Sequence, residues 1–118
     1  MKLNYNALRS TMVTFQSEPM NPNVEDVIDK TIAEGFTRED VTYAVKQAID
    51  SGLLQGNITS TLSGSFFFTV SDITPQGHQF IDAITEDTHW NRVKSFLKEE
   101  GLPLTVGTIS KAIAKIFL

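Results

Sequence analysis

The side chains with the clearest capacity for chemistry in this 118-residue chain are one imidazole and two carboxylates spaced four residues apart, His78, Asp82 and Glu86. On a helix this spacing stacks the three groups along one face, where they could begin a metal site. The same spacing is also typical of a solvated polar face, and the only other histidine, His89, is poorly placed to add a ligand. We therefore expect a polar helix surface here, without a bound metal or cofactor.

Acid–base catalysis by Asp82, Glu86 or Asp87 would need a buried carboxylate beside a substrate pocket, and the sequence indicates neither. Asp87 and Thr88 are more simply interpreted as the pair that caps a following helix. The chain has no cysteine, which excludes thiol nucleophiles, disulfides and thiolate metal sites, and its glycines do not form a phosphate-binding loop. We expect a protein that is not an enzyme and has no small-molecule substrate.

The composition is that of an ordinary globular domain, since hydrophobic residues make up 41% and charged residues 20% of the chain. No apolar run approaches the roughly 18 residues that a membrane span requires, so we expect no membrane association. The absence of cysteine suits the reducing cytoplasm, where we expect the protein to be located. The net charge of −4 is unevenly distributed, because no Lys or Arg lies between Gln47 and Asn91.

Apolar residues at helical spacing, together with capping residues, predict helices before and after a pair of strands. The clearest helix begins after Thr37, which is a suitable N-cap, and ends at Gly52. The other helices are predicted from Tyr5 to Phe15, from Val24 to Gly35, after Thr74-Pro75, from about Thr88 to Gly101, and after Thr105.

The two predicted strands, Leu53–Ser60 and Ser65–Ile73, form a hairpin that places Phe66 and Phe68 on one face and Phe67 on the other. Three helices, a hairpin and further helices follow one another in the order of a winged helix. We therefore predict an α+β, mainly helical, winged-helix-like fold, and a generic helical domain with a two-stranded flap is the alternative. One domain is expected over residues 1–118, with a core of about 1–86 and a C-terminal helical extension of about 87–118.

The stretch Gly77–Lys94, which reads GHQFIDAITEDTHWNRVK, resembles the signature of an uncharacterised bacterial and prophage family, the domain of unknown function numbered twenty-five thirteen. Two upstream segments, around Tyr43 and around Leu53, extend the resemblance over most of the chain. The family often has histidine where this sequence has Ala44, so no role of that histidine is carried over. The resemblance implies a winged-helix-like domain, a frequent phage or mobile-element context and no established activity.

A winged helix that binds DNA needs cations where the phosphates lie. The third predicted helix offers two cations and two polar side chains, namely Arg38, Lys46, Thr42 and Gln47, which we take as the DNA-binding candidates. Acidic residues surround them, and the hairpin has no basic residue with which to hold a phosphate backbone. Double-stranded DNA, bound by a dimer that forms through the last helix, is therefore the second of two hypotheses.

The favoured hypothesis is a protein-binding module of the adaptor or inhibitor type, whose partner is another protein or a second copy of the chain. The candidates are apolar residues of the hairpin and of the C-terminus: Leu62, Phe66, Phe67, Phe68, Phe117 and Leu118. An acidic surface with an apolar tip could also mimic nucleic acid toward a basic partner.

Overall fold

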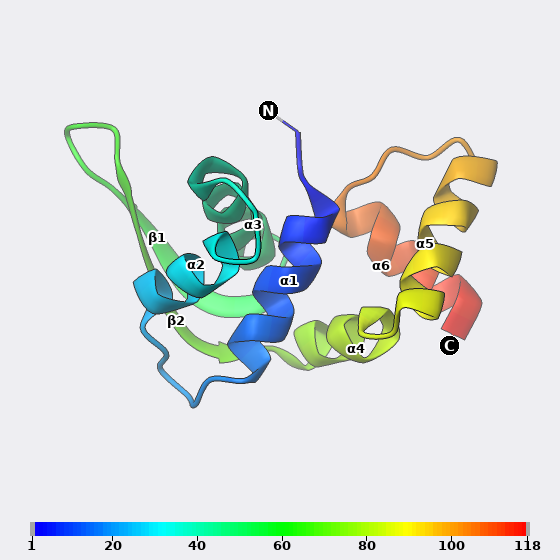
Figure 1. The fold of residues 1–118 in the computed structure, drawn as a ribbon, viewed down its shortest axis with the longest axis horizontal. Coiled ribbons are helices and arrows are strands. Elements are labelled where there is room, and N and C mark those ends of the chain that lie inside the picture. Colours follow the sequence, from blue (N-terminus) through cyan, green and yellow to red (C-terminus); the bar gives the residue numbers. More distant parts are fainter. Residues whose placement is uncertain (1, 118) are drawn as a thin grey trace.

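The computed structural model describes residues 2–117, and within them it contains six α-helices and one two-stranded antiparallel hairpin. In chain order the elements are α1 (Tyr5–Gln16), α2 (Val24–Ile32), α3 (Arg38–Asp50), β1 (Leu54–Ser60), β2 (Phe66–Ile73), α4 (Pro75–Ile84), α5 (Asp87–Glu99) and α6 (Val106–Phe117). Figure 1 shows α1 in the middle of the molecule, with α2, α3 and the hairpin on one side and α5 and α6 on the other. Each strand begins one residue later than predicted.

Side-chain caps determine where most of the helices begin. The side-chain oxygens of four N-cap residues each accept a hydrogen bond of 3.0–3.2 Å from the backbone N–H three residues further on, and these residues are Asn4, Asn23, Thr37 and Thr74. Thr105 accepts an equivalent bond of 3.1 Å at the start of α6. The predicted N-cap role of Thr37 is therefore confirmed, and α4 and α6 begin directly after Thr74 and Thr105 as predicted.

The start of α5 differs from the prediction. Glu86 occupies the N-cap position and its side chain makes no capping bond, whereas Asp87 is the first residue of the helix. The Asp87 carboxylate instead pairs with Arg9 of α1, at 2.8 Å. The predicted capping pair Asp87-Thr88 is therefore wrong. The Asp87 carboxylate pairs with a side chain of α1, which is distant in the sequence, and does not cap the backbone of α5.

The hairpin is the element that projects furthest from the helices (Figure 1). Its strands pair Ile58 with Phe68 and Ser60 with Phe66, and a bulge interrupts the ladder near Gly56. Phe66 and Phe68 lie on one face, with ring centroids 6.4 Å apart, as the alternation of the strand predicts. Phe67 points to the opposite face and is 64% exposed.

Buried apolar side chains from all six helices and both strands of the described chain join in one cluster. α1 packs against α2, α3 and α4. Trp90 of α5 is only 2% exposed, and its indole Nε1 donates a hydrogen bond of 3.1 Å to the side-chain oxygen of Asn6 in α1. The C-terminal helices are thus attached to the same core as the helices that precede the hairpin.

The arrangement is an α+β, mainly helical, winged-helix-like fold, which confirms the prediction. α3 takes the place of the recognition helix and the hairpin takes the place of the wing. The connection between α1 and α2 also contacts the outer edge of the hairpin, since the backbone N–H of Asn21 donates to the carbonyl oxygen of Ser71 at 2.9 Å. None of the helices found in residues 2–117 is long and apolar enough to cross a membrane.

Candidate functional site

A groove of about 450 Å³ separates the outer face of α3 from one face of the hairpin. Seven side chains line it: Glu39, Thr42, Tyr43, Lys46, Gln47, Phe66 and Phe68. Its volume lies within the range of about 300–1,000 Å³ that is common for binding sites. The aromatic rings make this groove a mainly apolar hollow between α3 and the hairpin.

The amphipathic pattern of α3 explains the helical side of the groove. Val41, Ala44, Val45 and Ala48 are fully buried and fix the inner face of the helix against the core. The groove residues lie at positions 39, 42, 43, 46 and 47, which form the opposite stripe at a spacing of three and four residues. Because Ala44 belongs to the buried stripe, a histidine at this position would not face the groove.

The strand alternation of β2 explains the other wall. Phe66 is 45% exposed and Phe68 is half-buried, where it packs against the edge of the core. Val70, two residues further along the same face of β2, is buried in the core. The hairpin thus presents two stacked rings toward α3, and Phe68 connects them to the edge of the core.

Ion pairs within the protein engage both cations of α3. Lys46 Nζ lies 2.8 Å from a carboxylate oxygen of Asp50, and this hydrogen bond raises the pKa of Lys46 above its usual value. The guanidinium of Arg38 contacts Glu25 at 3.2 Å and Asp29 at 3.0 Å, both on α2. A phosphate that approached α3 would have to compete with these carboxylates for each cation.

The predicted binding residues of the hairpin divide between its two faces and its tip. Phe66 and Phe68 line the groove, whereas Phe67 lies on the opposite face. Leu62 is fully exposed at the turn. The hairpin therefore presents an apolar surface toward α3, whereas Phe67 and Leu62 are exposed away from the groove.

α6, the helix that ends at Phe117, is on the other side of the molecule from the hairpin (Figure 1). Phe117 is half-buried, and its ring lies 4.8 Å from the His89 ring and 5.2 Å from the guanidinium carbon of Arg92. Phe117 therefore packs against α5 and does not join the groove. Leu118 lies outside the described residues.

The polar stripe of α4 forms no enclosed site. His78, Asp82 and Glu86 are all exposed along the helix or just after it. Within residues 2–117 no group of three histidine, aspartate or glutamate side chains gathers closely enough to hold a metal ion. The arrangement of these three residues is that of a solvated helix surface.

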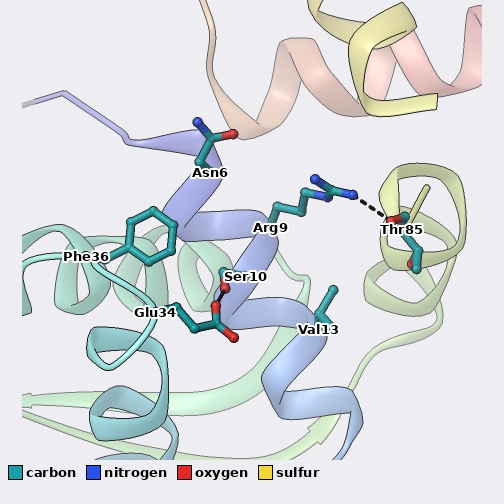
Figure 2. Close-up of a pocket in the computed structure, with 7 residues that line it drawn as sticks. All are labelled: Asn6, Arg9, Ser10, Val13, Glu34, Phe36 and Thr85. Atoms are coloured by element: carbon teal, nitrogen blue, oxygen red, sulfur yellow. Dashed lines mark hydrogen bonds between the residues drawn. The ribbon is translucent and has the colours of Figure 1, made fainter. Parts of the chain in front are cut away.

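A second hollow, of about 530 Å³, lies along α1 and is shown in Figure 2. Its polar side chains already have partners in the protein: Arg9 donates to the carbonyl oxygens of Ile84 and Thr85, at 2.8 and 2.6 Å, and Ser10 bonds to Glu34. These bonds connect α1 to neighbouring elements. The residues of this hollow thus act in holding the fold together, and we assign it no ligand.

The structure brings together side chains that the sequence assigned to two competing hypotheses. Thr42, Lys46 and Gln47, the DNA candidates, face Phe66 and Phe68, the protein candidates, across one groove. Arg38 does not line it. Glu39 and Tyr43 were not among the predicted site residues, although their spacing from the other outward positions of α3 is a signal that could have identified them.

Comparison with known proteins agrees with the resemblance found in the sequence. A family model described as "Hypothetical protein (DUF2513)" matches residues 2–103, which include α1 to α5 and the hairpin. An uncharacterised protein of Haemophilus influenzae is 28% identical over 119 residues, which cover 98% of this chain and 95% of the relative. No solved structure matches the chain. The chain belongs to the DUF2513 family of hypothetical proteins.

Proposed function

We propose that this protein is a non-enzymatic binding module of the cytoplasm, and that its groove between α3 and the hairpin binds another protein. The observation that supports this most directly is the lining of the groove, where Phe66, Phe68 and Tyr43 present aromatic surface. Aromatic side chains are enriched at the centres of protein interfaces, because they bury a large area at a small cost in conformational entropy. The charges around the groove agree with this choice over nucleic acid.

DNA is the second candidate, because the fold is winged-helix-like and Thr42 and Gln47 line the groove. The electrostatics weigh against it. Lys46 and Arg38 are held by carboxylates of α2 and α3, and the hairpin has no Lys or Arg. Neutralisation of phosphates supplies most of the affinity of proteins for nonspecific DNA, and this surface has little positive charge to offer.

A photo-crosslinking amino acid placed at position 66 tests the proposal inside cells that naturally contain the protein. The expected result is a covalent adduct with one defined protein, and the substitution Phe68→Ser should reduce its yield when introduced into the same chain. The control places the same amino acid at Gln79, an exposed position on α4, where no such adduct is expected. Adducts with nucleic acid from position 66 would contradict the proposal, as would equal adducts from both positions.

A further inference from the structure

The charged residues in the lining of the groove leave one carboxylate without a partner among the described residues. Glu39 lines the groove and forms no ion pair within residues 2–117, whereas the only cation in the lining, Lys46, is paired with Asp50. Residues 24–50, which span α2 and α3, contain seven acidic and three basic residues and have a net charge of −4. The hairpin adds no cation to this surface.

We propose that the partner segment that enters the groove carries a large apolar side chain next to a lysine or an arginine. This inference rests on the proposed function and specifies the chemistry of the partner. The apolar side chain would pack between Phe66 and Phe68 on one wall and Tyr43 on the other. The neighbouring cation would pair with the Glu39 carboxylate at the α3 side of the groove.

Charge complementarity determines the sign of the partner's charged group. A carboxylate at this place would face the carboxylate of Glu39, and like charges brought together across an interface oppose binding. A cation meets a carboxylate that has no partner within the described residues, and it can also lie over the exposed ring of Phe66. Lys46 does not repel it strongly, because Asp50 neutralises the ammonium at 2.8 Å.

The surface that a partner can bury in the groove is too small to provide the binding free energy alone. Both the apolar side chain and the neighbouring cation of the partner are therefore needed. One large side chain fills only part of a hollow of about 450 Å³, and further binding energy must come from contacts beside it. Of the acidic groups on α3, Asp40 accepts a hydrogen bond from Asn4 and Asp50 is paired with Lys46. Glu39 is therefore the carboxylate of α3 that is placed in the groove and without a side-chain partner in residues 2–117.

The test is selection of random short peptides, displayed on phage, on the intact immobilised protein. The expected result is enrichment of peptides that combine an aromatic or leucine residue with a nearby Lys or Arg. Their synthetic forms should bind more weakly when the salt concentration is raised from about 0.1 M to about 1 M, which shortens the Debye length from about 10 to about 3 Å. Replacing their Lys or Arg with Glu should weaken binding more than Glu39→Gln does, because it replaces an attraction with a repulsion.

Two pairs of variants separate the contributions. Glu39→Gln should weaken binding of the selected peptides about twofold to fivefold, the usual effect of one exposed charge pair, and make it less sensitive to salt. Its control is Asp26→Asn, which removes an exposed carboxylate from the first turn of α2 and should leave binding unchanged. Phe66→Ser should abolish binding, whereas Phe67→Ser, on the opposite face of the same strand, should not.

The outcomes distinguish this inference from the proposed function. Peptides that need Phe66 but show no preference for cations, or a preference for acidic residues, would overturn the inference and leave the groove as a protein-binding site. Selected peptides whose binding is insensitive to both Phe66→Ser and Glu39→Gln would overturn the inference and the proposed site together. Circular dichroism and urea denaturation of each variant confirm that a loss of binding is not a loss of folding.

Discussion

Gly77 is the residue on which the junction of α3, the hairpin and α4 most directly depends. A Cβ added at this position would lie 2.1 Å from the carbonyl oxygen of Leu53 and 2.7 Å from Cγ2 of Ile73. The Leu53 carbonyl is itself held in place, since it accepts a hydrogen bond of 3.1 Å from the backbone N–H of Thr74. The glycine that opens the family signature therefore allows α4 to approach the start of the hairpin.

We predict that Gly77→Ala lowers the free energy of unfolding by about 2–4 kcal/mol, because the backbone of α4 must move away from Leu53. Urea denaturation measures the effect. Gly107→Ala in α6 is the matched control: the nearest atom to its added Cβ is 3.8 Å away, so alanine should be neutral or stabilise by up to about 1 kcal/mol. Equal effects of the two substitutions would show that the close contact at Gly77 is not rigid.

Among individual residues, those on the α3 side of the groove could be predicted from the sequence. Which charged residues of α3 form ion pairs could not. The outward positions of α3 follow from the buried stripe, so Thr42, Lys46 and Gln47 were found from the sequence alone. The partners of Arg38 were not, because Glu25 and Asp29 belong to another helix and their approach depends on how α2 packs against α3. Local spacing identifies a surface but does not tell which of its charges are already paired.

At the scale of elements, Arg9 connects α1 to the corner between α4 and α5. Its guanidinium donates to the last carbonyl oxygens around α4, at Ile84 and Thr85, and pairs with Asp87 in the first turn of α5. Figure 2 shows the bond to Thr85. A cation at the C-terminal end of one helix and a carboxylate at the N-terminal end of the next both suit the helix dipoles. The corner is therefore fixed by a single side chain from a distant part of the sequence.

We predict that Arg9→Met destabilises the protein by about 1.5–3 kcal/mol, the usual range for hydrogen bonds that involve a charged group. Asp87→Asn should cost less than about 1 kcal/mol, because the Asp87 side chain is 87% exposed and its ion pair is screened by water. Thermal or urea denaturation of both variants provides the comparison. If Asp87→Asn were the more harmful change, the ion pair and not the carbonyl bonds would hold the corner.

The boundaries of the elements were largely predictable, but the angle between them was not. Capping residues such as Thr37 and Thr74 act on the nearest backbone, so their signal is contained in a few consecutive residues. The groove instead depends on the direction in which the hairpin leaves α3, near the bulge at Gly56. An added Cβ at Gly56 would lie 2.1 Å from the carbonyl oxygen of Thr69 across the ladder, a constraint that only the paired strands reveal.

At the scale of the whole molecule, charge is separated between the two sides of α1. Residues 24–50 have a net charge of −4, whereas residues 88–117 contain five basic and two acidic residues and have a net charge of +3. The described chain extends over 42 Å along its longest axis, which is several times the Debye length of about 8 Å at physiological salt. The two sides therefore act as separate electrostatic surfaces, and the net charge of the chain describes neither of them.

This separation predicts where a polyanion meets the protein. At about 50 mM salt, where phosphate contacts are strong, random double-stranded DNA should shift the amide NMR signals of α5 and α6 and leave those of Thr42 and Gln47 in place. The shifts should disappear at higher salt. The double substitution Lys111→Gln with Lys115→Gln should reduce them, whereas Lys46→Gln should not, because Asp50 already neutralises that cation. Shifts that begin in α3 and depend on Lys46 would show that the helix contacts DNA directly, and would favour a DNA-binding regulator over a protein-binding module.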